Sequence, residues 1–237
     1  MVLVDECHHS ASETLRSVLQ EVHATYVYGV TATPFRGDGL EKINEMLLGP
    51  VRFQYSAKEK AAEQGIGHYL VPRFTRTVLP FGQEKFPVTQ AYERLRRNEN
   101  RNGLIVADVK KALEAGRTPV ILTRFTDQAA ILYEMLKDSA QKPFLLTGEM
   151  PKKEREAAIR QTAEVMPQES MLLVATGQLV GEGFDYPRLD TLFLATPVSW
   201  KGVVEQYAGR LHRDYPGKND AFIYDYVDSH IPVFDKM

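Results

Sequence analysis

Two adjacent carboxylates, Asp5 and Glu6, follow an apolar run at the start of the sequence. Residues 1–4 are apolar without alternation, and this pattern predicts a strand buried on both faces of a parallel sheet. Ligands of open α/β sheets bind beyond the carboxyl ends of the strands, so one acid could hold a cation while its neighbour acts as a base. A loop with two solvent-exposed acids is the alternative interpretation of the same residues.

Two further segments carry polar residues beyond predicted strands. The strand predicted at residues 26–30 runs into Thr31-Ala32-Thr33-Pro34, which offers two hydroxyls at the same sheet edge as Asp5 and Glu6. Residues 174–185, VATGQLVGEGFD, leave another strand through three glycines and end in a carboxylate. Glycine-rich turns after strands suit phosphate binding, although an ordinary turn has the same composition.

A predicted helix near the end of the sequence carries QYAGRLHR, residues 206–213. Offsets of four and three residues place Gln206, Arg210 and Arg213 along one side of this helix. Two arginines beside a glutamine can clamp an anion, because guanidinium groups bind phosphate in a bidentate manner. A solvated helix face is the alternative.

The elements that must position these residues fall into three regions. Residues 1–36 contain two strands around a helix at 14–22, which is a βαβ fragment. Residues 37–97 are interrupted by glycine and proline pairs and are interpreted as a connector with a small ordered excursion. Residues 98–237 alternate cleanly, which predicts an α/β fold with a parallel sheet covered by helices on both faces. The elements predicted in this last region are helix 100–115, strand 120–122, helix 127–137, strand 144–146, helix 152–164, strands 171–175 and 192–194, helix 201–212 and strand 222–224.

Composition narrows the class of protein. The 237 residues are 43% hydrophobic and 25% charged, which is ordinary for a globular chain with a sizeable core. The formal net charge of -2 gives no bulk attraction to nucleic acid or to an anionic membrane, so such binding needs a local basic face. A single cysteine, Cys7, excludes an internal disulfide, and no apolar run is long enough to span a bilayer. A cytoplasmic protein without membrane contact is expected.

The four motifs together resemble the superfamily 2 helicases and translocases, which are built from two RecA-like domains. VDECHH matches the DExH box of that family, TATP its third motif, VATGQLVGEGFD its fifth and QYAGRLHR its sixth. The spelling is most similar to the branch that holds repair-type helicases and restriction subunits of type III systems. The resemblance covers essentially the whole sequence and implies a partial first RecA-like domain at 1–36, a connector at 37–97 and the second RecA-like domain at 98–237.

The resemblance implies that the acidic pair serves ATP. Asp5 would hold Mg²⁺, directly or through water, and Glu6 would orient and deprotonate the water that attacks the γ-phosphate. His8, Thr31 and Thr33 would relay between the nucleotide and the other domain.

The second domain would complete the nucleotide site. Arg210 and Arg213 would be arginine fingers, which are typically worth about 10³ to 10⁵ in turnover. Gln206 would support the same water or phosphate, and Gly183 and Asp185 would contact the nucleotide.

Three turns are expected to contact the backbone of a nucleic acid, reading its shape and not its bases. By resemblance, the partner is DNA, single-stranded or a duplex with an overhang, with RNA as the alternative. Ordinary Thr-Gly turns are common, so a purely structural role stays open for them. The residues concerned are Thr123 with Arg124, Thr147 with Gly148, and Thr176 with Gly177.

One element of the family pattern is missing from the sequence. The 237 residues contain no P-loop of the form GxxxxGK[ST], whose backbone N–H groups and lysine hold the nucleotide phosphates. In the family this motif precedes the DExH box, so an amino-terminal RecA-like segment is expected as the partner of these residues. The 237 residues alone are expected not to hydrolyse ATP. The alternative functions are the ATPase subunit of a restriction or defence complex and a non-enzymatic module that binds nucleic acid or protein.

The remaining charged residues are interpreted as structural. Contact with a nucleic-acid backbone is one interpretation of Arg94, Arg96, Arg97 and Arg101, but their interleaving with acids and amides favours an exposed helix face. Asp225 and Asp228 follow the last predicted strand and are expected to serve the fold.

Overall fold

The computed structural model describes residues 1–31, 41–55, 65–78, 87–177, 186–197, 211, 213 and 215–234. The chain divides into two compact units, Met1–Glu59 and Lys60–Met237, which we call the first and the second unit. Each is described by itself.

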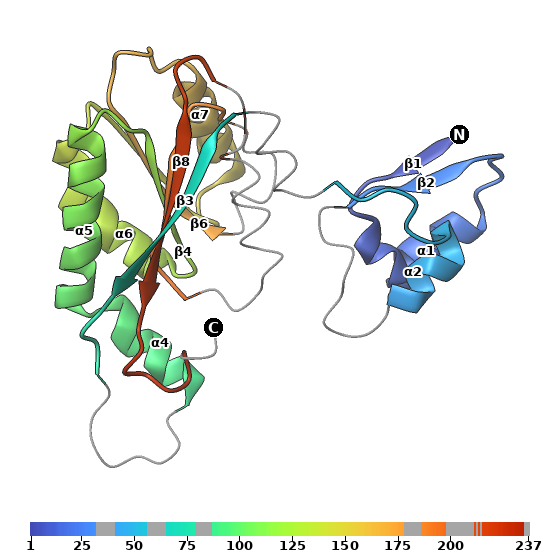
Figure 1. The fold of residues 1–237 in the computed structure, drawn as a ribbon, viewed down its shortest axis with the longest axis horizontal. Helices are drawn as coiled ribbons and strands as arrows, with labels where there is room; N and C mark the ends of the chain where they lie inside the picture. Colours follow the sequence, from blue (N-terminus) through green and yellow to red (C-terminus); the bar gives the residue numbers. More distant parts are fainter. Residues whose placement is uncertain are drawn as a thin grey trace. The chain divides into compact units, whose positions relative to one another are not determined.

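The first unit contains the βαβ fragment that the sequence predicts. Strands β1 (Val2–Val4) and β2 (Val27–Gly29) pair in parallel, with Val4 opposite Gly29. Between them lie the 3-10 helix η1 (Cys7–Ala11) and helix α1 (Glu13–Gln20), and helix α2 (Glu41–Leu48) follows β2 (Figure 1).

Only one face of this two-stranded sheet is covered by the described residues. Val4 is buried, and a Cβ added to Gly29 would lie 2.8 Å from both Cys7 Sγ and Leu48 Cδ1, so that η1 and α2 pack closely on this face. On the opposite face Leu3 is 63% exposed and Tyr28 is 52% exposed. The prediction of a first strand buried on both faces is therefore wrong for the described part of this unit, because full burial needs a layer on each side of the sheet.

The second unit is built on a six-stranded sheet, which confirms the predicted parallel α/β fold. Its strands lie in the order β3-β8-β7-β4-β6-β5, and every neighbouring pair is parallel (Figure 1). The strands are β3 (Gly67–Phe74), β4 (Pro119–Thr123), β5 (Lys142–Leu146), β6 (Met171–Thr176), β7 (Thr191–Leu194) and β8 (Asp220–Val227).

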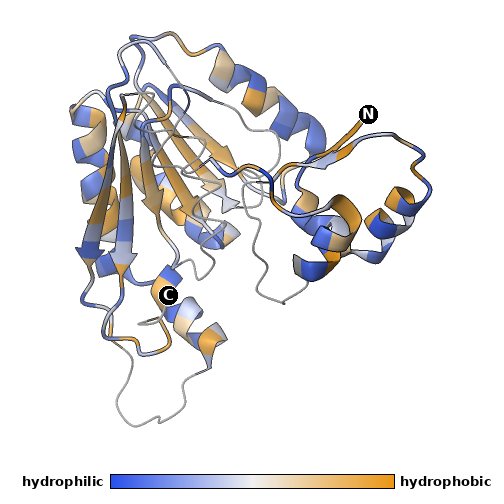
Figure 2. Ribbon diagram, turned by 45° about the vertical axis from the view of Figure 1, so that its right-hand side comes forward, coloured by the Kyte–Doolittle hydropathy of each residue, from blue (hydrophilic) through white to orange (hydrophobic). Residues whose placement is uncertain are grey.

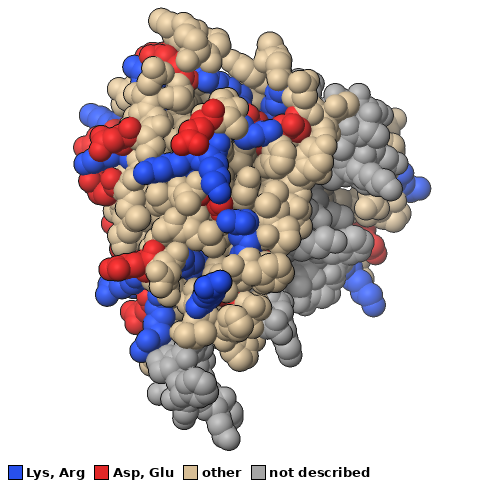
Figure 3. Space-filling model, turned by 60° about the vertical axis from the view of Figure 1, so that its left-hand side comes forward, with Lys and Arg blue, Asp and Glu red and all other residues tan. Residues whose placement is uncertain are grey.

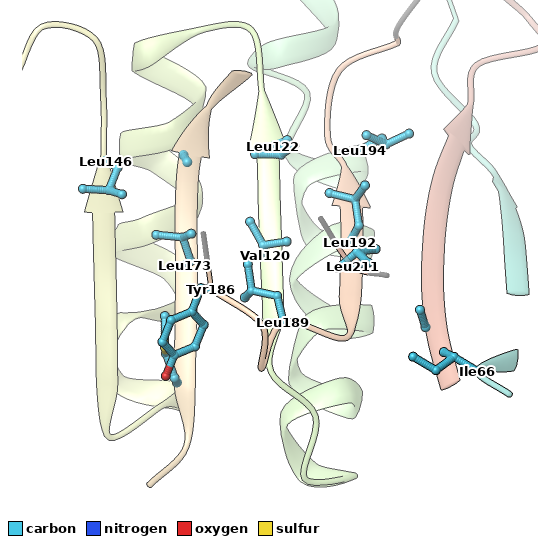
Figure 4. Close-up of a cluster of buried hydrophobic side chains, with 13 residues drawn as sticks. Ile66, Val120, Leu122, Leu146, Leu173, Tyr186, Leu189, Leu192, Leu194 and Leu211 are labelled. Atoms are coloured by element: carbon cyan, nitrogen blue, oxygen red, sulfur yellow. The ribbon is translucent and has the colours of Figure 1, made fainter. Parts of the chain in front are cut away.

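Helices cover both faces of this sheet. Helices α5 (Glu99–Glu114) and α6 (Thr126–Leu136) pack on one face, and α7 (Lys152–Ala163) packs on the other (Figure 1). Apolar residues fill the strands between these helices, whose outer faces are hydrophilic (Figure 2). The core on the α7 face takes alternate side chains from four neighbouring strands (Figure 4), namely Val120, Leu122, Leu146, Leu173, Leu192 and Leu194.

Part of the region interpreted as a connector belongs to this sheet. Residues 67–74 form the edge strand β3, which pairs with β8 over its whole length. Pro72 lies within β3, and an edge strand tolerates proline because one side of the strand needs no backbone donor. Helix α4 (Val88–Arg96) also falls in the region and leads directly into α5. The proline and glycine pairs therefore obscured a strand and a helix in the sequence pattern.

The other predicted elements of the second unit are present, and most of their ends differ from the predicted ends by one or two residues. The short 3-10 helix η2 (Lys137–Ser139) extends α6. The helix predicted at residues 201–212 lies almost wholly outside the described residues. Among the residues that the structure describes, no helix combines the length and apolar character needed to cross a bilayer.

Candidate nucleotide and nucleic-acid sites

A tight turn at the carboxyl end of β1 carries the acidic pair. Asp5 is exposed, and its Oδ1 accepts the backbone N–H of Glu6 at 2.8 Å. Glu6 has φ 47° and ψ 45°, the left-handed conformation that few residues other than glycine adopt. The N–H of Cys7 donates to the carbonyl oxygen of Val30 at 3.0 Å, so the turn is fixed to the end of β2. Such strain at a polar residue is typical of functional sites.

Three of the predicted nucleotide residues converge beside this turn. His8 Nδ1 lies 2.8 Å from Thr31 Oγ1 and 3.2 Å from Glu6 Oε2. The Thr31 hydroxyl donates to Glu6 Oε2 at 3.4 Å. The His8 side chain is 11% exposed and that of Glu6 is 42% exposed, so the imidazole lies inside the turn while the carboxylate reaches the surface. Thr33 lies outside the described residues.

Sequence reasoning missed Ser10 and Asn44, whose hydrogen bonds hold this turn in place. Ser10 is fully buried, and its hydroxyl lies 2.6 Å from the Cys7 carbonyl oxygen and 2.9 Å from Asn44 Oδ1. Asn44 Nδ2 donates to the carbonyl oxygen of His8 at 3.3 Å. Helix α2 thus anchors the backbone on which His8 is carried. A polar residue on the face of α2 that also carries Leu48 was the available signal.

The acidic turn offers the donor set that Mg²⁺ uses with nucleotides. Mg²⁺ is commonly held by one or two carboxylates together with substrate phosphates and water, and Asp5 is a single exposed carboxylate. Within the described ranges, no group of three or more His, Cys, Asp or Glu side chains could hold a metal. A single exposed carboxylate fits a Mg²⁺ that takes its other ligands from phosphates and water.

In the second unit, the sheet brings the three predicted nucleic-acid turns together. Thr123 and Thr176 are paired at the ends of the adjacent strands β4 and β6, and Thr147 follows β5 on the far side of β6. All three threonines are buried. The Thr123 hydroxyl donates to Gln128 Oε1 at 2.6 Å, and Thr176 Oγ1 accepts the N–H of Gly148 at 3.2 Å. These two hydroxyls hold the turns, while Arg124 and Gly148 are exposed.

The Arg124 side chain lies over the ring of Tyr92, a residue of α4. The Arg124 guanidinium carbon is 5.6 Å from the centre of the Tyr92 ring, and the Tyr92 hydroxyl donates to the Pro197 carbonyl oxygen at 3.4 Å. The Arg96 guanidinium similarly lies over Phe125, at 4.9 Å. On the face drawn in Figure 3, basic and acidic side chains are interspersed, in keeping with the small net charge.

The prediction that Arg101 lies on an exposed helix face is wrong. Arg101 is 2% exposed, and its Nε lies 3.1 Å from both carboxylate oxygens of Asp228. Its Nη1 donates to the Ala195 carbonyl oxygen at 2.5 Å, and burial lowers the pKa of the guanidinium. Arg101 lies four residues before Ile105, on the core-facing side of α5. The structural role expected for Asp228 is confirmed by this buried pair.

Of the predicted site residues in the sixth motif, the structure describes Arg213. Its side chain is exposed, and its carbonyl oxygen accepts a hydrogen bond from Lys218 Nζ at 3.1 Å. The same ammonium group donates to the carbonyl oxygens of Leu189 at 2.6 Å and Pro187 at 3.0 Å. Lys218, which the sequence analysis did not single out, thereby joins the segment after the fifth motif to the end of the sixth. Gln206, Arg210, Gly183 and Asp185 lie outside the described residues.

Two family models match the sequence. The helicase conserved C-terminal domain matches residues 91–215, and the type III restriction enzyme, res subunit, matches residues 1–36. The first match covers strands β4 to β7 of the six-stranded sheet, and the second covers the acidic turn.

Viral proteins are similar over nearly the whole sequence. "Putative helicase 161L" of Invertebrate iridescent virus 6 is 28% identical over an alignment of 239 positions, which covers 96% of this chain and 51% of that protein. "Putative ATP-dependent RNA helicase L396" of Acanthamoeba polyphaga mimivirus is 24% identical over an alignment of 243 positions, which covers 100% of this chain and 45% of that protein. The chain spans about half the length of the curated relatives it matches.

A solved structure supports the fold. S. cerevisiae Dbp5 bound to RNA and ADP BeF3 aligns with a TM-score of 0.60 at 13% sequence identity, covering 99% of this chain and 55% of that one. At this identity the similarity shows a shared RecA-like architecture.

Proposed function

Because this chain belongs to the helicase conserved C-terminal domain family of the superfamily 2 helicases, we propose that it forms part of an ATP-driven helicase or translocase acting on DNA. The observation that carries the proposal is the turn after β1, where His8 joins Glu6 to Thr31 at the end of β2. This geometry supports a hydrolytic role, because a base must be held still beside the water that it activates.

The acidic pair divides the chemistry of ATP hydrolysis between its two members. Asp5 would hold Mg²⁺, which when bound neutralises charge on the phosphates. Glu6 would take the proton from the attacking water, and its half-exposed carboxylate is accessible to that water. His8 and Thr31 would fix the Glu6 carboxylate and sense whether a γ-phosphate is bound.

We assign the charge-stabilising role to the sixth motif. The exposed Arg213, together with Arg210 and supported by Gln206, would contact the same triphosphate, and Gly183 and Asp185 would contact the nucleotide. Lys218 would hold the Arg213 backbone against the segment that follows the fifth motif.

The nucleic-acid path would run along the carboxyl edge of the sheet. Arg124 and the exposed Gly148 turn would contact phosphates, and Thr176 with Gly177 would continue the path. Thr123 and Thr147 are buried, so they would support these turns from inside the protein. DNA is proposed because of the branch resemblance, and RNA is the alternative that a binding assay distinguishes.

The proposal is tested by comparing the full-length protein with a polypeptide limited to these 237 residues. We expect the full-length protein to hydrolyse ATP and to be stimulated by single-stranded DNA, measured as phosphate release. The 237-residue polypeptide should show negligible hydrolysis, because it has no P-loop to hold the β- and γ-phosphates. A full-length protein without nucleic-acid-stimulated hydrolysis, or a 237-residue polypeptide with a comparable rate, would refute the proposal.

A second candidate function has one specific observation in its favour. Residues 1–36 match the restriction subunit model, so the protein could be the ATPase of a restriction or defence complex. In that case its hydrolysis would drive DNA cleavage by an associated nuclease. Cleavage of plasmid DNA by the purified native complex, dependent on ATP, distinguishes this function from that of a helicase acting alone.

A further inference from the structure

The Lys218 side chain joins two segments that are distant in the sequence. Its ammonium group donates to the carbonyl oxygens of Leu189 at 2.6 Å, Pro187 at 3.0 Å and Arg213 at 3.1 Å. A lysine ammonium is strongly hydrated and usually extends into water, so three convergent backbone acceptors around a half-buried lysine replace that hydration. These contacts hold the segment after the fifth motif at a fixed spacing from the end of the sixth.

A tight turn fixes the place of Lys218 at the amino end of the sheet. The N–H of Lys218 donates to the carbonyl oxygen of Tyr215 at 3.0 Å, and Gly217 has a φ of 83°. Proline at the second position and a glycine with positive φ at the third are typical of a type II turn. The carbonyl oxygen of Asn219 then accepts the N–H of Gly67 at 2.9 Å, and β8 follows. The sheet therefore holds the turn that carries Lys218.

The segment after the fifth motif is fixed by contacts other than those with Lys218. Tyr186 and Leu189 are buried in the core on the α7 face of the sheet. Arg188 donates through Nη1 to the Met166 carbonyl oxygen at 2.8 Å and through Nη2 to the Glu169 carbonyl oxygen at 2.7 Å. This segment therefore provides a fixed reference to which Lys218 joins the backbone of Arg213.

Arg213 lies where the chain leaves the core. Leu211 is 2% exposed and belongs to the same core cluster as Leu189, whereas the Arg213 side chain, two residues later, is exposed. A guanidinium on a long stem reaches one place reproducibly only when its backbone is held, and a misplacement of about 1 Å can cost about 10² in rate. The hydrogen bond from Lys218 holds the backbone at this point.

We propose that Lys218 is a positioning residue for ATP hydrolysis, because it sets the place of Arg213 relative to the segment after the fifth motif. This inference rests on the proposed function, in which Arg213 stabilises charge on the phosphates. A group that acts on the charge developing in the transition state affects turnover more than substrate binding. Loss of the Lys218 ammonium should therefore lower kcat and leave the affinity for ATP nearly unchanged.

The test uses Lys218→Met in the full-length protein, because methionine keeps most of the apolar stem and removes the charged donor. We expect kcat for ATP hydrolysis to fall about 10- to 100-fold. The affinity for ATP, measured by competition with a fluorescent nucleotide in the presence of Mg²⁺, should stay close to that of the wild type. Lys218→Arg keeps a cationic donor near the carbonyl oxygens and should be faster than Lys218→Met.

The matched control is Arg117→Met, which removes another cation from the same end of the sheet. Arg117 pairs with Asp220 at the start of β8, and its Nη1 lies 3.5 Å from Thr191 Oγ1 at the start of β7. These contacts support the strands themselves. We therefore expect Arg117→Met to keep the wild-type kcat, even where it lowers the free energy of unfolding measured in urea.

A double-mutant cycle separates positioning from general support of the fold. If Lys218 acts through Arg213, Lys218→Met should have little further effect on kcat when Arg213→Ala is already present. Lys218→Gln serves in the same cycle if the methionine variant folds poorly. An unchanged kcat, equal slowing in both backgrounds, or a parallel loss of ATP affinity would overturn the role of Lys218 alone. An Arg213→Ala protein that hydrolysed ATP at the wild-type rate would overturn the proposed function and this inference together.

Discussion

Single residues in this molecule carry roles that their types alone do not reveal. Glu6 adopts a left-handed backbone, although it is not a glycine, and its N–H is held by the neighbouring Asp5 carboxylate. The conformation turns the chain from β1 directly into η1. It therefore places His8 next to Thr31, 23 residues away in the sequence.

The Arg101–Asp228 pair yields a prediction about stability at the residue scale. Both side chains are fully buried, and Thr75 also donates to the Asp228 carboxylate. Asp228→Asn would leave the Arg101 charge buried without its counter-ion, so the free energy of unfolding should fall by about 3 to 5 kcal/mol. Urea unfolding measures the change.

A double replacement provides the control for this prediction. Arg101→Met with Asp228→Leu removes both charges and fills similar volume, so we expect it to be far less destabilising than the single change. If Asp228→Asn lowered the free energy of unfolding by less than about 1 kcal/mol, the pair would have to be exposed to solvent. That result would contradict its burial in the core.

At the scale of elements, the regular parts of the second unit could be predicted from the sequence. Unbroken apolar strands alternate with helices whose apolar faces recur every three or four residues, and that pattern dictates a covered parallel sheet. β3 could not be recognised, because Pro72 and the flanking glycines are signals of a connector unless the strand is known to lie at an edge.

Long-range contacts explain what the sequence could not predict about the sites. Sequence motifs locate Thr123 and Arg124, but the acceptor for the Arg124 N–H lies 72 residues away. The same holds for Asn44, which reaches the acidic turn only because α2 packs on η1. Arg101 was expected on an exposed helix face because its sequence neighbours are charged, but it faces the core.

The contact between α2 and η1 leads to a prediction at this scale. Asn44→Ala removes a donor to the His8 carbonyl oxygen and a partner of the buried Ser10 hydroxyl. Because the turn that carries Glu6 and His8 loses this support, we expect the rate of ATP hydrolysis by the full-length protein to fall about tenfold. Met46→Ala, on the same helix but 83% exposed, is the control. Unchanged turnover in Asn44→Ala would mean that α2 does not position the turn.

At the scale of the whole molecule, the two units differ in how many faces of their sheets are covered by other residues. The second unit has a core on each face of its sheet, with Leu173 on one face and Leu172 on the other. The described part of the first unit exposes Leu3 and Tyr28 on the open face of its two strands. A two-stranded sheet is marginally stable by itself, and in the first unit η1 and α2 pack on one of its faces.

In the proposed function, residues of the two units act in the same reaction. Glu6 of the first unit would activate the attacking water, and Arg213 of the second would stabilise charge on the same phosphates. Groups that act on one transition state are not independent, so removing both costs little more than removing the more important one. Groups that serve separate functions lower the rate by factors that multiply.

The most direct test is therefore a double-mutant cycle on ATP hydrolysis by the full-length protein. Glu6→Gln and Arg213→Ala are measured alone and together, with Glu13→Gln and Arg160→Ala as exposed controls of the same residue types. We predict that each change lowers single-turnover phosphate release by about 10²-fold or more, and that the double variant is no slower than about the slower single variant. Losses that multiply in the double variant, or an Arg213→Ala protein that hydrolyses ATP at the wild-type rate, would contradict the claim that both residues serve one ATP.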